Sequence, residues 1–284
     1  MFGEISNFDF FSLSKRDVHL NILKNSGHYT IEDITFDFDY VVEKDYMQLL
    51  LNNYDLLSLI GNTELDTLKN VASWVFNMLT SSCEAVQPVK KTHEMICDVR
   101  NKIYGASCYT YACVLCEIYL SLGFKSRFVF CLPIDCYPVD CHVVTIVYSF
   151  LQNKWLLFDA AQDLYFSNEN NEVLGLDELR YCLINDIDVQ VNFLNGGKYN
   201  MDKRMLIIKK QQVLSYMAKN LYRFRSFRNS YEDRISTNKV VKLLDLVPCN
   251  YLTTPFEVVE YIYQRKTKHI HLYTSNSQCF WKCP

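Results

Sequence analysis

The amino-acid sequence predicts an α+β fold. Elements of one kind are grouped along the chain, with helical patterns over residues 64–122, strand-like segments within 126–160 and helical patterns again within 177–222. The composition favours a packed protein with short loops, because 49% of the 284 residues are hydrophobic and only 8 are glycine and 6 proline. This length suffices for one large domain or two modest ones.

Residues 1–60 are expected to form a lead-in that packs on the main domain. They combine short strand-like pieces over 29–42 with an apolar run over 46–61. We expect the core of the domain to span residues 61–185, and residues 186–284 to be an α/β extension that completes the same domain.

The first predicted helix spans residues 64–80. Asn62 or Thr63 can cap its start, and Asp66, three residues after Thr63, resembles part of a capping box. Apolar side chains then recur at helical spacing, at Leu65, Leu68, Val71, Val75 and Met78. A shorter helix is expected near residues 92–101.

A second long helix is predicted over residues 108–122, with Gly123 just past its end. It is apolar on two faces, one with Cys108, Ala112, Leu115, Tyr119 and Leu122, the other with Cys113, Cys116 and Leu120. A helix of this kind is typical of the centre of a core.

The segments after this helix are rich in β-branched and aromatic residues. Strands are predicted over 126–132, 141–150 and 154–160. Helices are predicted over 177–184 and 205–222, and the chain is expected to end in a strand and a tail.

Two cysteines of the central helix allow two interpretations. Cys113 and Cys116 can simply pack in the core, or form half of a zinc site completed by Cys136 and Cys141 or by His142. The residues between the pair continue a helix, whereas a zinc clip usually lies in a tight turn. We therefore favour packing and expect no bound metal.

Cys108 differs from these two by its position. Gly105, Ala106 and Ser107 allow a sharp turn just before the helix. A cysteine in the first helical turn lies near unpaired N–H groups, which favour a thiolate and can also hold an oxyanion. Cys108 is thus a candidate nucleophile, provided that a base lies nearby.

His142 is the candidate base, since it opens a predicted strand. The other histidines have less context, and they are His19, His28, His93, His269 and His271. Of these, His269 and His271 alternate near the C-terminus, which makes them either one face of a strand or a chance pair.

Asp159 is the candidate to orient the base. If residues 150–153 form the turn between the second and third strands, Ser149 pairs with Lys154 and Asp159 falls opposite Val144. That position is diagonal to the histidine, at about 7–8 Å between backbones. Asp163 and, less well placed, Asp140 remain alternatives for this role.

At these residues the sequence resembles the transglutaminase-like superfamily, and in particular its stand-alone bacterial members. The resemblance covers roughly residues 64–180 and rests on "GASCYTYACVLCEIYLSLGFKSRFVF", "DCHVVTIVY" and "NKWLLFDAAQDLYF". The family often has an acidic residue or asparagine before the cysteine and a proline after the aspartate, where this chain has Ser107 and Ala160. The segment "YMAKNLYRF" (216–224) also resembles bacterial members, without an assigned role.

The resemblance implies a papain-like fold in which the nucleophile helix packs on an antiparallel sheet. It also implies a Cys108–His142–Asp159 triad that acts on an amide or related acyl group through a thioester, with water or an amine as acceptor. The alternative is a binding or scaffold protein that keeps the fold without turnover. No cofactor is expected, and the substrate would be a peptide, a protein or a small amide.

Charge and composition limit the partners. The net charge of −3 argues against nucleic acid or an anionic membrane as the main partner, and we expect no signal peptide and a cytoplasmic location. One basic and aromatic stretch departs from this balance, with Arg223, Arg225, Arg228 and Arg234. Our hypothesis for this stretch is contact with an anionic group of the substrate.

Overall fold

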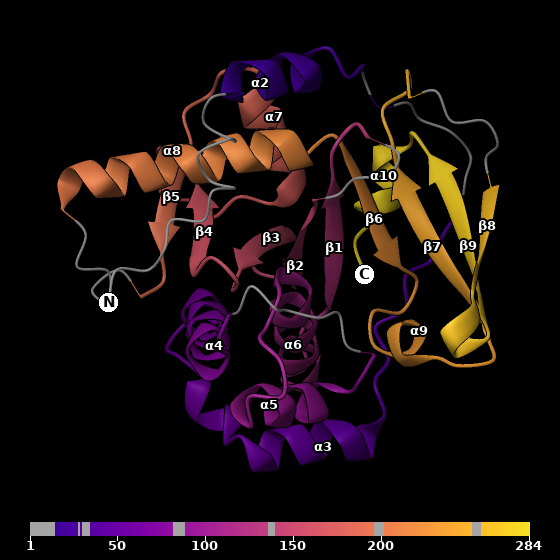
Figure 1. The fold of residues 1–284 in the computed structure, drawn as a ribbon. Coiled ribbons are helices and arrows are strands. Elements are labelled where there is room, and N and C mark those ends of the chain that lie inside the picture. The colour runs from indigo at the N-terminus through magenta and orange to yellow at the C-terminus, as the bar shows by residue number, and fades with distance from the viewer. Residues whose placement is uncertain are drawn as a thin grey trace.

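The computed structural model describes residues 15–27, 29, 35–81, 89–135, 140–195, 202–251 and 257–284. Within these residues the centre is a nine-stranded sheet in the order β5-β4-β3-β2-β1-β6-β7-β9-β8 (Figure 1). Its strands are β1 (Ser126–Leu132), β2 (His142–Ser149), β3 (Lys154–Asp159), β4 (Leu164–Ser167), β5 (Gln190–Phe193), β6 (Arg223–Phe227), β7 (Val240–Leu246), β8 (Glu257–Ile262) and β9 (Thr267–Thr274).

Helices cover both faces of this sheet (Figure 1). One face carries α3 (Lys44–Asn53), η1 (Leu56–Leu59), α4 (Glu64–Met78), α5 (Thr92–Arg100) and α6 (Cys108–Ser121). The other face carries α2 (Arg16–Lys24), α7 (Leu176–Ile184), α8 (Lys203–Asn220) and α10 (Ser277–Phe280). The short α9 (Glu232–Ile235) and η2 (Tyr263–Arg265) lie in the connections around β7 and β9. The α+β prediction is confirmed.

The central helix is as buried as its sequence predicts. Every residue of α6 after Cys108 is buried, and the helix lies against β1 and β2. The Tyr119 hydroxyl donates to the carbonyl of Leu68 on α4 at 2.7 Å, and the Thr145 hydroxyl on β2 donates to the carbonyl of Ala112 at 3.0 Å. Burial of each large apolar side chain of α6 contributes about 1.5–3 kcal/mol to folding. Together with the two hydrogen bonds, this packing fixes the position at which the helix begins.

Local sequence signals set the element boundaries around the core. The capping box of α4 is present, with the Asp66 amide donating to the Thr63 hydroxyl at 3.0 Å. Past the end of α6, Gly123 adopts a φ of 89°, a left-handed conformation that favours glycine. Strand β1 has the predicted bounds, and the other helices and strands predicted between residues 64 and 222 differ from the structure by one or two residues at their ends.

The sheet is antiparallel where the central helix α6 packs on it, at β1 and β2, as the family resemblance implies. One pair of strands outside this region is parallel. Strand β9 pairs with β7 in parallel and with β8 in antiparallel fashion. The chain passes from β7 to the outer strand β8 before it returns as β9, so β9 enters beside β7 in the same direction. Strands β6, β7, β9 and β8, all from the last third of the chain, extend the same sheet as the core strands.

The N-terminal region differs from its prediction. Residues 1–14, 28 and 30–34 lie outside the described part, and residues 35–42 form no strand beyond one isolated bridge between Asp39 and Asn229. The apolar run instead forms α3, whose Tyr46 and Leu50 are buried against the core under α6. The C-terminal tail also contains a short helix, α10.

Candidate active site

Cys108 is the first residue of α6 and is partly exposed. Ser107 caps the helix, since its hydroxyl accepts the Thr110 amide at 3.3 Å. The preceding Ala106 amide donates to the carbonyl of Thr80, which ties the turn to the end of α4. The thiol is therefore held by a capped turn where unpaired N–H groups favour negative charge.

His142 is the first residue of β2 and Asp159 the last residue of the neighbouring β3, so both lie at the same end of these two inner strands. The strands pair in the predicted register, with Ser149 opposite Lys154. The Nε2 atom of His142 lies 2.6 Å from Oδ2 of Asp159, and both side chains are buried. The other carboxylate oxygen, Oδ1, accepts the Gln162 amide at 3.2 Å, which fixes its plane.

This environment controls the protonation of His142. Burial lowers the pKa of His142, but the charge of Asp159 and its hydrogen bond, together with a hydrogen bond to the Cys108 thiol, raise that pKa to about 10. Because Asp159 engages Nε2, Nδ1 is the ring nitrogen left to meet the thiol. The three predicted residues are thus adjacent, and Asp159 and Cys108 both favour the imidazolium form of His142.

The two alternative carboxylates have other partners. Asp163 accepts the Asn195 backbone amide at 3.1 Å and its side-chain amide at 2.5 Å. Asp140 forms an ion pair with Lys219 on α8. Asp159 is therefore the carboxylate that contacts the histidine.

Helix α8 supplies a residue that the sequence did not identify. The Tyr216 hydroxyl lies 3.1 Å from Oδ1 of Asp140 and 3.2 Å from the carbonyl oxygen of Cys141, and its ring meets the His142 ring edge-on. Burial and the charge of Asp140 raise the pKa of Tyr216, so the phenol remains a donor. Its only sequence signal was its place in the segment 216–224.

Other thiols near this site are held in the neutral form. Burial raises the pKa of Cys113 to about 12 and that of Cys141 to about 11, and it also raises the pKa values of Cys116 and Cys131. Cys113 and Cys116 pack in the core, as the sequence favours. Cys136, the other residue considered for zinc, lies outside the described residues.

A second cysteine–histidine pair lies on α5. The Sγ atom of Cys97 is 3.8 Å from Nε2 of His93, whose Nδ1 is 2.9 Å from the Tyr54 hydroxyl. Within the described chain no carboxylate forms a hydrogen bond with this histidine, in contrast to His142. The pair is therefore a natural comparison for the reactivity of Cys108.

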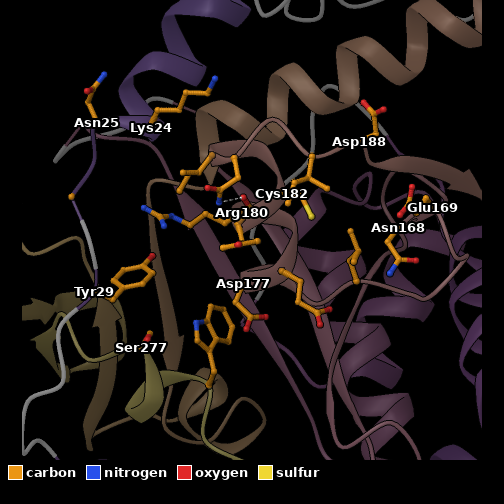
Figure 2. Close-up of a pocket in the computed structure, with 18 of the residues that line it drawn as sticks. Lys24, Asn25, Tyr29, Asn168, Glu169, Asp177, Arg180, Cys182, Asp188 and Ser277 are labelled. Atoms are coloured by element: carbon orange, nitrogen blue, oxygen red, sulfur yellow. Dashed lines mark hydrogen bonds between the residues drawn. The ribbon is translucent and has the colours of Figure 1, made fainter.

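A cavity of about 1070 Å³ lies apart from the triad. Figure 2 shows its lining, which includes Tyr29, Asp177 and Arg180 from the region around α2 and α7. The Arg180 guanidinium is buried and donates to the Ser26 hydroxyl and to the carbonyl of Leu221. None of the three candidate residues Cys108, His142 and Asp159 lines this cavity.

The arginine-rich stretch is largely internal. Arg223 and Arg234 are buried, and Arg225 pairs with Asp245 at 2.7 Å. The hypothesis of contact with an anionic substrate group is thereby restricted to Arg225 and the exposed Arg228.

In the described part of the chain, one group of side chains could hold a metal ion. It consists of Glu260, His269 and His271, on β8 and β9, and contains no triad residue.

His28, also considered at the sequence level, lies outside the described residues. The helices of the described segments include none long and apolar enough to cross a bilayer.

Comparison with known proteins gives a match to a family model and matches to four chains of solved structures. Residues 58–160, which include the three candidate residues, match the family model of the transglutaminase-like superfamily. A candidate cysteine protease from Cytophaga hutchinsonii, known from a crystal structure, is 15% identical over 54% of this chain, with a TM-score of 0.34. The match covers 50% of that protein's length. No curated protein matches the chain.

Proposed function

Since the segment 58–160 belongs to the transglutaminase-like superfamily, we propose that this protein is a cysteine enzyme that cleaves or transfers an amide-linked acyl group through a thioester. The proposed residues are Cys108 as nucleophile, His142 as acid and base, and Asp159 as the group that orients the histidine. The proposed substrate class is a peptide, a protein or a small amide.

One observation carries the proposal. A buried His142–Asp159 pair with 2.6 Å between Nε2 and Oδ2 lies beside a cysteine that begins a capped helix. Burial of an ion pair is costly unless both partners are well bonded, which is why such pairs are frequent at functional sites. A histidine with a purely structural role would need only the contact with Asp159. The additional contact of His142 with the Cys108 thiol supports a role in catalysis.

In the first half-reaction, the Cys108 sulfur attacks the acyl carbon and a C–S bond forms. The thiol proton resides on Nδ1 of His142, and the negative charge that develops on the acyl oxygen meets the N–H groups of the first turn of α6. The tetrahedral intermediate collapses as the C–N bond breaks. His142 gives its proton to the departing amine, which leaves a neutral imidazole and a thioester.

In the second half-reaction, water or an amine attacks the thioester. His142 removes a proton from this nucleophile, the C–S bond breaks, and the sulfur leaves as the thiolate. The imidazolium and the thiolate are restored, so protons balance over the cycle. Asp159 orients His142 and stabilises the imidazolium in both halves.

Site-specific alkylation tests this proposal without knowledge of the substrate. Native protein is treated with limiting iodoacetamide at neutral pH, and the modified cysteines are mapped by peptide mass spectrometry. We expect Cys108 to react first, and its rate to fall by about 10-fold or more in His142→Ala, because the thiolate loses its cationic partner.

The matched control is His93→Ala, which removes the histidine from the other cysteine–histidine pair, with Cys97. It should leave the rate at Cys108 unchanged. If Cys108 reacted no faster than Cys97, or equally fast in both histidine variants, the enzyme proposal would fail. The protein would then be better regarded as a binding protein that retains the fold.

A further inference from the structure

Strands β8 and β9, at one edge of the sheet, carry two histidines and a carboxylate that do not belong to the triad. Glu260 on β8 pairs with His269 on β9, and His271 follows two residues later on the same face. One ligand atom from each side chain lies within 4.8 Å of the others. We propose that Glu260, His269 and His271 form a binding site for a divalent transition-metal ion, a site independent of the proposed acyl transfer.

An outer carboxylate gives His271 the orientation that a metal ligand needs. Nδ1 of His271 lies 3.2 Å from Oδ2 of Asp245, a buried residue on β7. Asp245 is itself held by Arg225 at 2.7 Å. A histidine that donates its second N–H to a buried carboxylate is the usual arrangement behind metal-bound imidazoles.

Nε2 of the same imidazole lies 3.5 Å from Oε2 of Glu260, so His271 stands between two carboxylates. A divalent cation placed between Nε2 and Oε2 would be bound by both atoms, while Nδ1 stays directed at Asp245.

Space and access are also present. The three side chains line a cavity of about 410 Å³, whose wall includes Tyr109, the neighbour of Cys108. Both histidines are buried, while the Glu260 side chain is 58% exposed and can close over an entering ion. Three protein ligands beside such a cavity would leave a coordination position for water.

One group competes with the metal. A guanidinium nitrogen of Arg265 lies 3.4 Å from Nε2 of His269, and Arg265 is only partly buried. A metal ion can bind to Nε2 of His269 only if the Arg265 guanidinium moves away from this nitrogen. Because Asp245 is paired with Arg225, which lines the same cavity, the exposed carboxylate of Glu260 is the anionic ligand of the site. Imidazole and carboxylate donors suit zinc and its neighbours among the divalent metals.

Calorimetric titration of the full chain with Zn²⁺ tests the proposal. We expect one site per chain whose affinity falls in Glu260→Gln, His269→Ala and His271→Ala. Asp245→Asn should weaken binding by about 10- to 100-fold, the usual effect of an outer carboxylate, and removal of a direct ligand by more. Glu257→Gln is the matched control, because Glu257 is also exposed on β8 but pairs with Leu272 outside the cluster.

The many cysteines of this chain offer other zinc ligands, so Co²⁺ is used as a second probe. Binding at the proposed site should give visible d–d bands without the near-ultraviolet charge-transfer band of cobalt–thiolate bonds, and Glu260→Gln should abolish them. The proposal is overturned by the absence of saturable binding, by a thiolate band, or by equal affinity in Glu260→Gln and Glu257→Gln.

Discussion

The ring of Tyr216 on α8 meets the ring of His142 edge-on, with 5.2 Å between centroids and 66° between planes. This contact joins the last third of the chain to the start of β2. The tyrosine hydroxyl also bonds to Asp140 and to the Cys141 carbonyl, the two residues just before the histidine. Tyr216 thus restrains both the ring and the backbone of His142, which makes it a positioning residue.

Tyr216→Phe should slow alkylation of Cys108 by about 2- to 10-fold, because one hydrogen bond contributes about 0.5–1.5 kcal/mol. Tyr216→Ala, which also removes the ring contact, should slow it further. The control is Tyr148→Phe. This substitution removes a hydroxyl that donates to Asn153 at the other end of β2, away from His142. A structural role alone would leave the rate at Cys108 unchanged in folded Tyr216→Phe, so an unchanged rate would contradict this assignment.

Asp159→Asn should lower the pKa of His142. In the native protein the charge and hydrogen bond of Asp159 raise that pKa to about 10 against the effect of burial. Without the carboxylate, burial is opposed only by the contact with Cys108, so the pKa should fall well below about 10. NMR titration of the histidine ring signals measures this, with the His142 signal assigned from its loss in His142→Gln.

The same variant should react slowly at Cys108 in neutral solution, because the imidazolium that stabilises the thiolate is lost. We expect a fall of about 100-fold or more in the alkylation rate, within the range known for the loss of an orienting carboxylate. Asp163→Asn, at the alternative carboxylate that bonds to Asn195, should leave both the pKa of His142 and the rate unchanged. The reverse pattern would assign the orienting role to Asp163.

Stability should depend on pH through this pair. The pKa of His142 is about 10 in the folded protein, above the ordinary 6.5. A group whose folded pKa is raised stabilises the fold fully below its unfolded pKa, and this contribution is lost as pH rises toward the folded pKa. The difference in unfolding free energy between wild type and His142→Gln should therefore shrink from pH 6.5 to pH 10.

Urea unfolding at several pH values measures this difference. Buried thiols also make the unfolding free energy depend on pH in this range, because burial raises the pKa of groups such as Cys113 to about 12. This contribution is the same in wild type and in His142→Gln, so it cancels in the difference between the two proteins. A difference that stayed constant from pH 6.5 to pH 10 would contradict the protonated state of His142.

The core of the fold could be predicted because its signals are local. The cap at Thr63, the doubly apolar helix after Cys108 and the β-branched strands that follow each fix an element within one or two residues. The turn between β2 and β3 also fixed the register that brings Asp159 to His142. These features depend on residues that are near one another in the chain.

The rest could not be predicted because its determinants are distant in sequence. Strand β6 carries Arg225 in its centre, a residue that periodicity does not favour in a strand, and its charge is met by Asp245 on β7. Tyr216 reaches His142 from a helix more than seventy residues later. The metal-ligand cluster likewise needs the insertion of β9 between β7 and β8, which no local pattern encodes.

The buried ion pair between Glu117 and Arg234 should be a major determinant of stability. Glu117 lies in the middle of α6 and Arg234 on α9, and both side chains are at most 1% exposed. The glutamate also accepts the Tyr46 hydroxyl and the Thr92 amide, each at 3.2 Å. Every oxygen of the carboxylate is therefore engaged inside the core.

Removal of one partner leaves an uncompensated buried charge, so Arg234→Met or Glu117→Gln alone should destabilise the protein by about 3–5 kcal/mol. The double variant Glu117→Gln/Arg234→Met should be much less destabilised than the sum of the two single variants, because neither charge then remains buried alone. Urea unfolding of all four proteins gives this coupling. As a control, Lys239→Ala breaks the exposed pair with Glu232 and should change little. Additive effects of the two core substitutions would show that this pair does not stabilise the junction of α6 and α9.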